Sequence, residues 1–374
     1  MSTGLDILVL GAGVVGLSAA RRLCATGARV TVLDSVDPGG RGSRAAAGVA
    51  IPSVRLYDDP VMLDFSRAGR AALTDDLGSL PEGVLLRRGQ GILRIVADAK
   101  GQEALARKAS AFPEELGTWV DAARLVELEP ALEGTPLLGA FESARGHMVD
   151  TEGYVNALLG AAVRSGVRLR LGESARSVEE TSHGIEVRTG RETLRADQLV
   201  VSAGPWSSTL AGLPALPLKP VRGQMLVVHQ PGVSLSRVVS GPTYLAPWRA
   251  GEIVVGATEE EAGFVENVTP AGLLHLSATV AKLAPRLREA RFVRAWAGLR
   301  SVTPDGRPYV GIYPGMRRTF VATGLGGQGI LTGAHAALAL VELMAGGRGD
   351  LAAPFSPARM ASRPHVGEEG NRNE

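Results

Sequence analysis

The chain has 374 residues, of which 45% are hydrophobic and 21% charged, enough apolar sequence for more than one domain with its own core. Its 40 basic and 38 acidic residues leave a formal charge of +2 and form no basic run, which argues against a nucleic-acid partner. The first apolar segment is short and is broken by Asp6 and by glycines, so the sequence predicts a cytoplasmic protein with no membrane span and no signal peptide.

The chain carries little that would hold a metal ion or form a disulfide. Its one cysteine, Cys24, excludes an internal disulfide and is expected to pack within a helix. The six histidines are scattered without metal-ligand spacing, and no GxSxG hydrolase motif is present. No metal site is predicted.

The first elements have the order of a dinucleotide-binding unit. Residues 5–10 are a short, mostly apolar run typical of a buried parallel strand, and residues 14–25 predict a helix. They are joined by the turn Gly11-Ala12-Gly13-Val14-Val15-Gly16. In this pattern the first glycine permits a tight turn, the second lets the backbone approach a pyrophosphate, and the third lets the helix pack on the strand. The N-terminus of the helix supplies free N–H groups to the phosphates.

A second apolar strand, residues 29–33, ends in Asp34, at the spacing where this fold places a carboxylate on a ribose hydroxyl. An acid at this position disfavours a 2′-phosphate and therefore NADP. The pattern predicts an adenine dinucleotide, either FAD or NAD. The alternative is a glycine-rich turn in an ordinary α/β domain.

The later elements are predicted from periodicity and caps. Helices are expected at 101–112, at 151–165 after the cap Asp150 or Thr151, and at 330–345 before Gly346. Strands are expected at 167–171, 184–189, 198–203, 221–229, 237–246 and 252–257, and those after residue 220 are expected to be antiparallel. Residues 81–145 are less regular.

Four segments, in this order, resemble the glycine oxidase and D-amino-acid oxidase superfamily of FAD-dependent oxidoreductases, most closely its glycine oxidase branch. They are Gly-Arg-Gly-Ser-Arg-Ala-Ala-Ala-Gly at 40–48, the apolar strand that runs into Ala203-Gly204-Pro205-Trp206, the segment 296–311 that begins Trp-Ala-Gly-Leu-Arg, and Phe-Val-Ala-Thr-Gly at 320–324. The resemblance covers about residues 5 to 358. It selects FAD over NAD.

The resemblance implies an α/β fold, with a Rossmann-like FAD-binding domain and an inserted α+β substrate domain built on a largely antiparallel sheet. The FAD-binding domain is expected to comprise residues 1–80, 146–217 and 295–360, and the substrate domain 81–145 and 218–294. Residues 361–374 are polar and are expected to form a flexible tail.

The motif and the resemblance together assign a set of residues to the cofactor. FAD is expected to be noncovalent, because neither cysteine nor histidine stands at the positions where covalent members of the superfamily attach it. The expected FAD-binding residues are Gly11, Ala12, Gly13, Val14, Val15, Gly16, Asp34, Ser43, Arg44, Ala46, Ala47, Gly48, Ala175, Ala203, Gly204, Trp206, Arg300, Gly326, Gly327, Gln328, Gly329 and Ile330.

Two residues are expected to be catalytic by binding the substrate carboxylate. Arg300 matches the superfamily's carboxylate-binding arginine, and a guanidinium suits that task because it donates two parallel hydrogen bonds. Its alternative role is a structural ion pair with Asp305. Tyr244 matches the tyrosine of a strand that reads YxxPR in the family, although Trp248 replaces the arginine here. Its alternative role is packing in a sheet.

The loop 324–329 precedes a helix, so its N–H groups are expected to stabilise the negative charge of a reduced flavin. Gly327 stands where glycine oxidases usually have an arginine, and Val49 replaces a methionine. Both changes reshape the pocket and weaken the case for glycine as the substrate. The role of Glu259, beside the expected cavity, stays open.

The resemblance implies oxidation of the C–N bond of a small amino acid or amine, namely glycine, a D-amino acid or an N-alkyl glycine. The Cα hydride passes to flavin N5, the imino acid is hydrolysed to a keto acid and ammonia, and O2 is reduced to H2O2. Three alternatives stay open: a dehydrogenase with another electron acceptor, an oxidase of a secondary amine or cyclic imino acid, and a non-catalytic flavin-binding subunit. The oligomeric state is open too, with a homo-oligomer among the choices.

Overall fold

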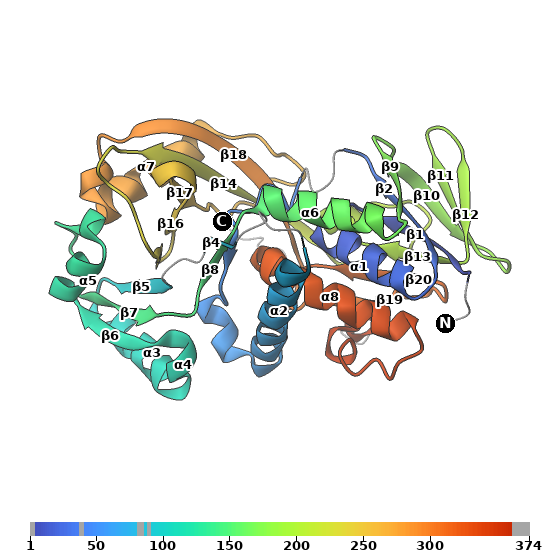
Figure 1. Cartoon of the computed structure of the whole chain (residues 1–374), viewed down its shortest axis with the longest axis horizontal. Coiled ribbons are helices and arrows are strands. Elements are labelled where there is room, and N and C mark those ends of the chain that lie inside the picture. The colour runs from blue at the N-terminus through green and yellow to red at the C-terminus, as the bar shows by residue number, and fades with distance from the viewer. Residues whose placement is uncertain (1–3, 37–40, 81–85, 88–90, 361–374) are drawn as a thin grey trace, which may run out of the picture.

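Two sheets organise the computed structural model, which describes residues 4–36, 41–80, 86–87 and 91–360. They lie at opposite ends of the long axis of the molecule, a six-stranded sheet at the right of Figure 1 and an eight-stranded sheet at the left. The tail expected at 361–374 lies outside the described residues.

The six-stranded sheet has the strand order β19-β20-β13-β1-β2-β9 and is parallel except at β19. Because β1, β2, β13 and β20 are parallel, their carboxyl ends meet at one edge of the sheet. The glycine-rich turn follows the central strand β1 at this edge. The bounds are β1 Asp6–Leu10, β2 Arg29–Asp34, β9 Arg168–Leu171, β13 Gln198–Val201, β19 Tyr309–Ile312 and β20 Thr319–Thr323.

Both faces of this sheet are covered, because its strands are apolar on both sides. Ile7 and Val9 of β1 pack with four helices, α1 Val14–Ala25, α2 Pro60–Ser79, α6 Thr151–Arg164 and α8 Gly329–Met344. Three of them, α1, α6 and α8, lie in front of the sheet in Figure 1. Leu8 and Leu10 face a three-stranded antiparallel sheet of β10 Ala175–Glu180, β11 Ile185–Thr189 and β12 Thr193–Ala196. The predicted strands and helices of this half are present, and of the two expected caps of α6, Asp150 and Thr151, the structure has Asp150.

A buried carboxylate ties the helices together. Asp76 on α2 is 2% exposed and accepts hydrogen bonds from Nη2 of Arg21 at 2.6 Å and of Arg22 at 2.7 Å, both on α1. It also accepts one from the hydroxyl of Tyr154 on α6 at 3.2 Å. The ion pairs and hydrogen bonds of one side chain therefore join three helices.

Replacing this carboxylate is expected to destabilise the fold. Asp76→Ala leaves two half-buried guanidinium groups without their partner, and we expect the free energy of unfolding in urea to fall by about 3 kcal/mol. The matched control is Asp75→Ala at the exposed neighbouring position, which we expect to change that free energy by no more than about 0.5 kcal/mol. Equal effects of the two substitutions would contradict the prediction.

A buried histidine gives the stability a dependence on pH. His335 on α8 is 6% exposed, and the centroid of its ring lies 4.9 Å from that of Phe65 on α2. Burial lowers the pKa of His335 below 6.5. The unfolded chain binds a proton at this position near pH 6.5 and the folded chain does not, so unfolding becomes easier as the pH falls below 6.5. His335→Gln should flatten this decline in urea unfolding between about pH 6.5 and 5, whereas His275→Gln on an exposed helix face should leave it unchanged.

The eight-stranded sheet has the order β18-β14-β17-β16-β15-β5-β7-β6. All its neighbouring strands are antiparallel except β15 and β5, which agrees with the expectation for the strands after residue 220. The bounds are β5 Ile92–Val96, β6 Thr118–Asp121, β7 Gly139–Ser143, β14 Lys219–His229, β15 Val238–Ser240, β16 Tyr244–Pro247, β17 Ile253–Gly256 and β18 Arg291–Val302.

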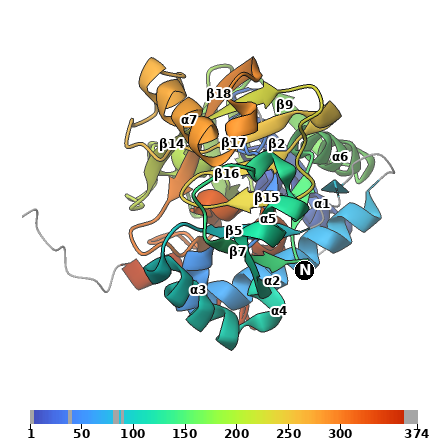
Figure 2. The ribbon, with the colours of Figure 1, turned by 90° about the vertical axis from the view of Figure 1, so that its left-hand side faces the viewer.

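Successive side chains of β14 point to opposite faces of this sheet. Leu226 and Val228 belong to a core with α5 Ala122–Leu128 and α7 Pro270–Leu283, and these helices lie at the end of the molecule seen in Figure 2 with α3 Ala99–Ala111 and α4 Pro113–Leu116. Met225 and Val227 belong to a second core that includes Ala47 and Ile51, so this face turns toward the other half of the chain.

One predicted strand is wrong. The expected strand 237–246 is a hairpin of two strands, β15 and β16, paired in antiparallel order. The turn between them contains Gly241 and Pro242, a dipeptide that favours a turn because proline has no N–H to donate to a ladder. The turn places Tyr244 at the start of its own strand.

A small antiparallel sheet, β3 Val49–Ala50, β8 His147–Val149 and β4 Leu86–Arg87, connects the halves. Short 3-10 turns lie at 54–58, 130–132, 204–208, 249–251, 285–287, 326–328, 353–355 and 357–360. The domain boundary predicted at residue 295 falls inside β18, which stays in the eight-stranded sheet to Val302. The division into two domains therefore stays a prediction.

Candidate active site

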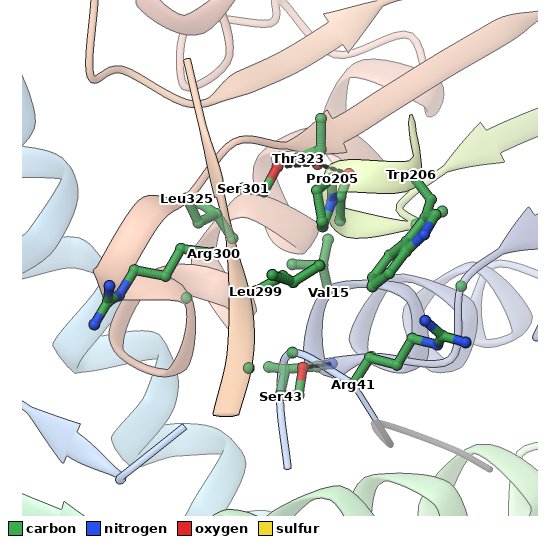
Figure 3. A pocket seen from close by; sticks show the side chains of 18 of the residues that line it. Val15, Arg41, Ser43, Pro205, Trp206, Leu299, Arg300, Ser301, Thr323 and Leu325 are labelled. Carbon is green, nitrogen blue, oxygen red and sulfur yellow. Dashed lines mark hydrogen bonds between the residues drawn. The ribbon is translucent and has the colours of Figure 1, made fainter. Parts of the chain in front are cut away.

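A cavity of about 520 Å³ lies where the two large sheets meet. The six-stranded sheet contributes the carboxyl ends of β1, β2, β13 and β20, and the eight-stranded sheet contributes residues of β14, β16 and β18. Ligands of open parallel sheets bind at the carboxyl ends of the strands. Figure 3 shows this cavity from close by, with Arg300 on one side of the view and Arg41 and Trp206 on the other.

The turn after β1 is packed so tightly that only glycine fits at two positions. Gly11 has a φ of 105°, and a Cβ there would lie 2.4 Å from the carbonyl oxygen of Ser202. A Cβ on Gly16 would lie 1.9 Å from the carbonyl oxygen of Gly11. Gly13 has no side chain to cap α1, and the hydroxyl of Ser43 accepts a hydrogen bond from the N–H of Val14 at 3.1 Å. Gly13, Val14 and Val15 line the cavity, so the N-terminus of this helix lies at the cavity wall.

A carboxylate marks the end of the cavity beside β2. Oδ2 of Asp34 accepts a hydrogen bond from the N–H of Ala12 at 2.7 Å, and Oδ1 accepts one from the N–H of Val36 at 3.1 Å. Burial raises the pKa of Asp34, and these two backbone donors oppose the rise. Glu173 and Ala175 line the same cavity. Asp34 is thus fixed in orientation by the turn that carries the glycines.

The segment 41–48 is tied to both halves of the molecule. Arg41 lies over the ring of Trp206, 4.7 Å from its centroid (Figure 3). Nη1 of Arg41 pairs with Glu266 at 2.8 Å. Nε1 of Trp296 donates a hydrogen bond to the carbonyl of Ala45 at 2.9 Å, and the hydroxyl of Thr151 donates one to the carbonyl of Ala46 at 3.1 Å. This segment therefore forms a fixed wall of the cavity.

The loop after β20 brings a second helix N-terminus to the cavity. Gly324 and Gly326 have φ values of 80° and 54°, which turn the chain into α8. None of the described side chains caps α8, and the cavity is lined by Gly326, Gly327, Gly329 and Ile330. An uncapped helix N-terminus favours negative charge beside it.

Arg300 has a carbonyl as its partner. Its Nη1 donates a hydrogen bond to the carbonyl oxygen of Thr258 at 3.0 Å, and within the described part of the chain it forms no ion pair. Asp305, the acid considered as its alternative partner, is paired with Arg359 at 2.9 Å instead. Arg300 lines the cavity, and no carboxylate of the described residues forms an ion pair with its guanidinium.

Tyr244 also lines the cavity, from β16. Burial raises the pKa of Tyr244 to about 12, although the nearby charge of Arg300 lowers it in part. At neutral pH the hydroxyl is therefore protonated and can donate a hydrogen bond.

The cavity brings together most of the residues that the sequence singles out. It is lined by Gly11, Gly13, Val14, Val15, Asp34, Ser43, Ala46, Ala47, Gly48, Val49, Ala175, Ala203, Gly204, Trp206, Tyr244, Arg300, Gly326, Gly327, Gly329 and Ile330. Four expected residues do not line it: Ala12, Gly16, Arg44 and Gln328. The N–H of Ala12 holds Asp34, Gly16 packs on Gly11, and the guanidinium of Arg44 bonds to Asn156.

Other residues fall outside the sequence prediction. The cavity is also lined by Arg41, Glu173 and Met225. Arg41 lies beside the small-residue run and Glu173 two residues before Ala175, whereas no signal in the sequence pointed to Met225. Glu259 is exposed and does not line the cavity, and Trp248 is buried in the core beside Met225. Among the described residues, no group of histidine, cysteine and acidic side chains could hold a metal ion. In the same part of the chain, every helix is too short or too polar to cross a membrane.

Comparisons with known proteins agree with these observations. The profile of the DAO family, described as FAD dependent oxidoreductase, matches residues 6–343. A glycine oxidase from Pseudomonas aeruginosa is 31% identical, over 94% of this chain and 98% of its own length. The crystal structure of glycine oxidase from Geobacillus kaustophilus has a TM-score of 0.84 at 26% identity, covering 98% of this chain and 100% of that one. The crystal structure of iminodiacetate oxidase from Chelativorans sp. has a TM-score of 0.82 at 27% identity, covering 94% of this chain and 98% of that one.

Proposed function

Because the chain belongs to the DAO family of FAD-dependent oxidoreductases, as its motifs predicted, we propose that it oxidises the C–N bond of a small amino acid and passes the electrons to O2. The proposed substrates are glycine, a D-amino acid or an N-alkyl glycine. Loss of two electrons and two protons gives an imino acid, which water hydrolyses to a keto acid and ammonia, or an alkylamine where the nitrogen is substituted. O2 takes up the two electrons and two protons as H2O2.

The residues of the cavity fit noncovalent FAD. Asp34, held by two backbone N–H groups, would accept hydrogen bonds from ribose hydroxyls. Gly13, with only one atom within 4 Å of a Cβ built on it, leaves room for a pyrophosphate at the N-terminus of α1. The N-terminus of α8, at Gly327 and Gly329, would stabilise negative charge on the reduced ring system.

Arg300 carries the proposal for the substrate. Among the described residues, this guanidinium has a single backbone carbonyl as its hydrogen-bond partner, so it keeps donors free for a carboxylate in the cavity. Two parallel hydrogen bonds would fix the orientation of that carboxylate. The protonated hydroxyl of Tyr244 would donate a further hydrogen bond to it. We therefore assign the two residues to substrate binding and orientation.

Positioning accounts for most of the proposed catalysis. Bound FAD supplies the two-electron acceptor for the hydride that leaves Cα. Two carboxylates line the cavity, Asp34 and Glu173, and both come from the half that holds the six-stranded sheet. Among the described residues, no histidine or carboxylate of the eight-stranded sheet lines the cavity. We therefore propose that the amine loses its proton to solvent before the reaction, and that Arg300 and Tyr244 contribute by holding Cα in place.

Oxidation of a secondary amine or cyclic imino acid is the second candidate. A Cβ on Gly327 would have no neighbour closer than 3.9 Å, the Nε of Arg300, so space stays open beside the guanidinium. The N-substituent or ring of such a substrate would fill this space, whereas glycine as the substrate would leave it empty. The similarity to iminodiacetate oxidase, a protein named for a secondary amine, supports this candidate.

An anaerobic screen tests these candidates. Purified yellow enzyme is mixed with glycine, sarcosine, proline and D-amino acids, and bleaching of the flavin absorbance near its visible maximum is recorded. A substrate bleaches the flavin. If the yellow colour returns when air is readmitted and a stoichiometric amount of peroxide forms, O2 is supported as the acceptor. Bleaching without reoxidation in air indicates a dehydrogenase, and a flavin that no amine bleaches indicates a non-catalytic flavin-binding subunit.

A further inference from the structure

Two glycines lie on the face of the eight-stranded sheet that carries Arg300 and Tyr244. Gly223 on β14 pairs with Gly298 on β18, two residues before Arg300, so Gly223 and Arg300 share a face. Gly256 on β17 pairs with Met225 on one side and with Tyr244 on the other. The strands next to Arg300 and Tyr244, the two residues proposed to bind the substrate carboxylate, therefore have no side chain at these points.

The guanidinium of Arg300 lies directly over the bare Cα of Gly223. A Cβ built on Gly223 would lie 2.7 Å from Nη2, 2.9 Å from Cζ and 3.0 Å from Nη1 of Arg300, and these are its three nearest atoms. Gly256 has the same relation to Tyr244, since a Cβ there would lie 2.6 Å from the phenolic oxygen. Both polar groups thus lie at the level of the sheet, below the height that a side chain on these glycines would occupy.

The far end of the guanidinium is held by backbone on the opposite side of β14. The carbonyl of Thr258 accepts from Nη1 of Arg300, and the N–H of Thr258 donates to the carbonyl of Gln224 at 3.1 Å. Arg300 therefore reaches from β18 across β14 to the segment that follows β17.

The carboxylate of Glu260 holds this segment in place. Glu260 exchanges two backbone hydrogen bonds with Arg222, at 2.9 and 3.0 Å, and its side chain forms an ion pair with the same arginine. It also accepts hydrogen bonds from the hydroxyl of Thr258 and from Nε2 of Gln224. The carbonyl that anchors Arg300 is thus part of a network of hydrogen bonds.

We propose that Gly223 is a positioning residue: its missing side chain sets the height and tilt at which Arg300 meets the substrate carboxylate. The inference rests on the proposed role of Arg300. A methyl group at residue 223 would displace the guanidinium by several tenths of an ångström or more and break its bond to Thr258. Displacements of about 1 Å in a group that orients substrate can cost roughly 100-fold in rate.

Gly223→Ala tests the inference without disturbing the fold. The backbone of Gly223 is outside the left-handed region, so alanine is tolerated there, and the three atoms nearest to the new methyl group belong to the end of a long side chain rather than to backbone. We expect kcat/KM to fall about 10- to 100-fold, mostly through KM, with FAD content and melting temperature unchanged. The matched control is Gly160→Ala on α6, where the new Cβ would lie 3.2 Å from Nη1 of Arg164. We expect it to leave kcat/KM unchanged.

A double-mutant cycle separates this inference from the proposed function. In an Arg300→Ala background, Gly223→Ala should have no further effect, because the group it displaces is gone. If Gly223→Ala lowers kcat/KM equally in both backgrounds, or has no effect in the wild type while Arg300→Ala does, the inference is overturned and the proposed function stands. If Arg300→Ala changes nothing, both are overturned.

Two further measurements test the inference, and the first of them needs no turnover. Titration of the holoenzyme with acetate, followed by the visible flavin spectrum, should show weaker binding in Gly223→Ala by about the same factor as the rise in KM, and equal acetate affinity would overturn the inference. Glu260→Gln leaves Gly223 intact but loosens the anchor at Thr258, and we expect a smaller rise in KM in the same direction. A Glu260→Gln enzyme with unchanged KM would contradict the anchoring part of the inference.

Discussion

Arg300→Ala is expected to lower kcat/KM for the best amino-acid substrate by about 100- to 1,000-fold, while the purified enzyme stays yellow. The substitution removes two charge-assisted hydrogen bonds to the substrate carboxylate, each worth about 1.5 to 3 kcal/mol, and part of that loss is offset by water that enters the site. FAD should be retained, because the glycine turn, Asp34 and the N-terminus of α8 are untouched.

The measurement is steady-state kinetics with peroxide detection, together with the ratio of flavin to protein absorbance. Arg300→Lys keeps the charge without the planar fork, and we expect an intermediate loss. Arg291→Ala, an exposed arginine at the start of the same strand, is the matched control and should leave kcat/KM unchanged. An Arg300→Ala enzyme with wild-type kinetics for every substrate would remove the case for a carboxylate ligand.

The parts of the site that the sequence predicted are those whose roles are local. The strand, the glycine turn, the helix and Asp34 follow one another along the chain, so the chemistry of each position can be worked out from its neighbours. The structure gives Gly11 the tight turn and Gly16 the packing role expected of them, and the cavity lies beside Gly13 and Asp34.

The parts that escaped prediction depend on contacts between distant segments. Arg41 reaches Glu266 and Trp206, which belong to other elements, and no local pattern connects them. The sequence drew attention to Glu259, but its neighbour Glu260 makes the hydrogen bonds to β14. The pairing of residues 258–260 with β14 decides which of the two side chains points inward, and the sequence does not show this pairing. The same holds for Gly223, whose importance appears only when Arg300 lies across it.

Gly13→Val is expected to abolish FAD retention while leaving the fold intact. Gly13 has an extended backbone, with φ −77° and ψ −177°, which valine adopts readily, and the nearest atom to a new Cβ is Oγ of Ser43 at 3.1 Å. The cost therefore arises in the cavity, where the isopropyl group would occupy the space between the N-terminus of α1 and the pyrophosphate.

Gly11→Val would be a poorer test, since its Cβ collides with backbone and the chain would unfold. For Gly13→Val we expect colourless protein after purification, a wild-type far-ultraviolet circular dichroism spectrum, and a melting temperature that added FAD no longer raises. A ligand at about 100 times its dissociation constant stabilises the folded state by about 2.7 kcal/mol, so the loss of this shift is readily measured. Gly78→Ala, a glycine on α2 with no atom within 4 Å of the new Cβ, should keep its FAD. A Gly13→Val protein that stays yellow would show that the cofactor does not pass this turn.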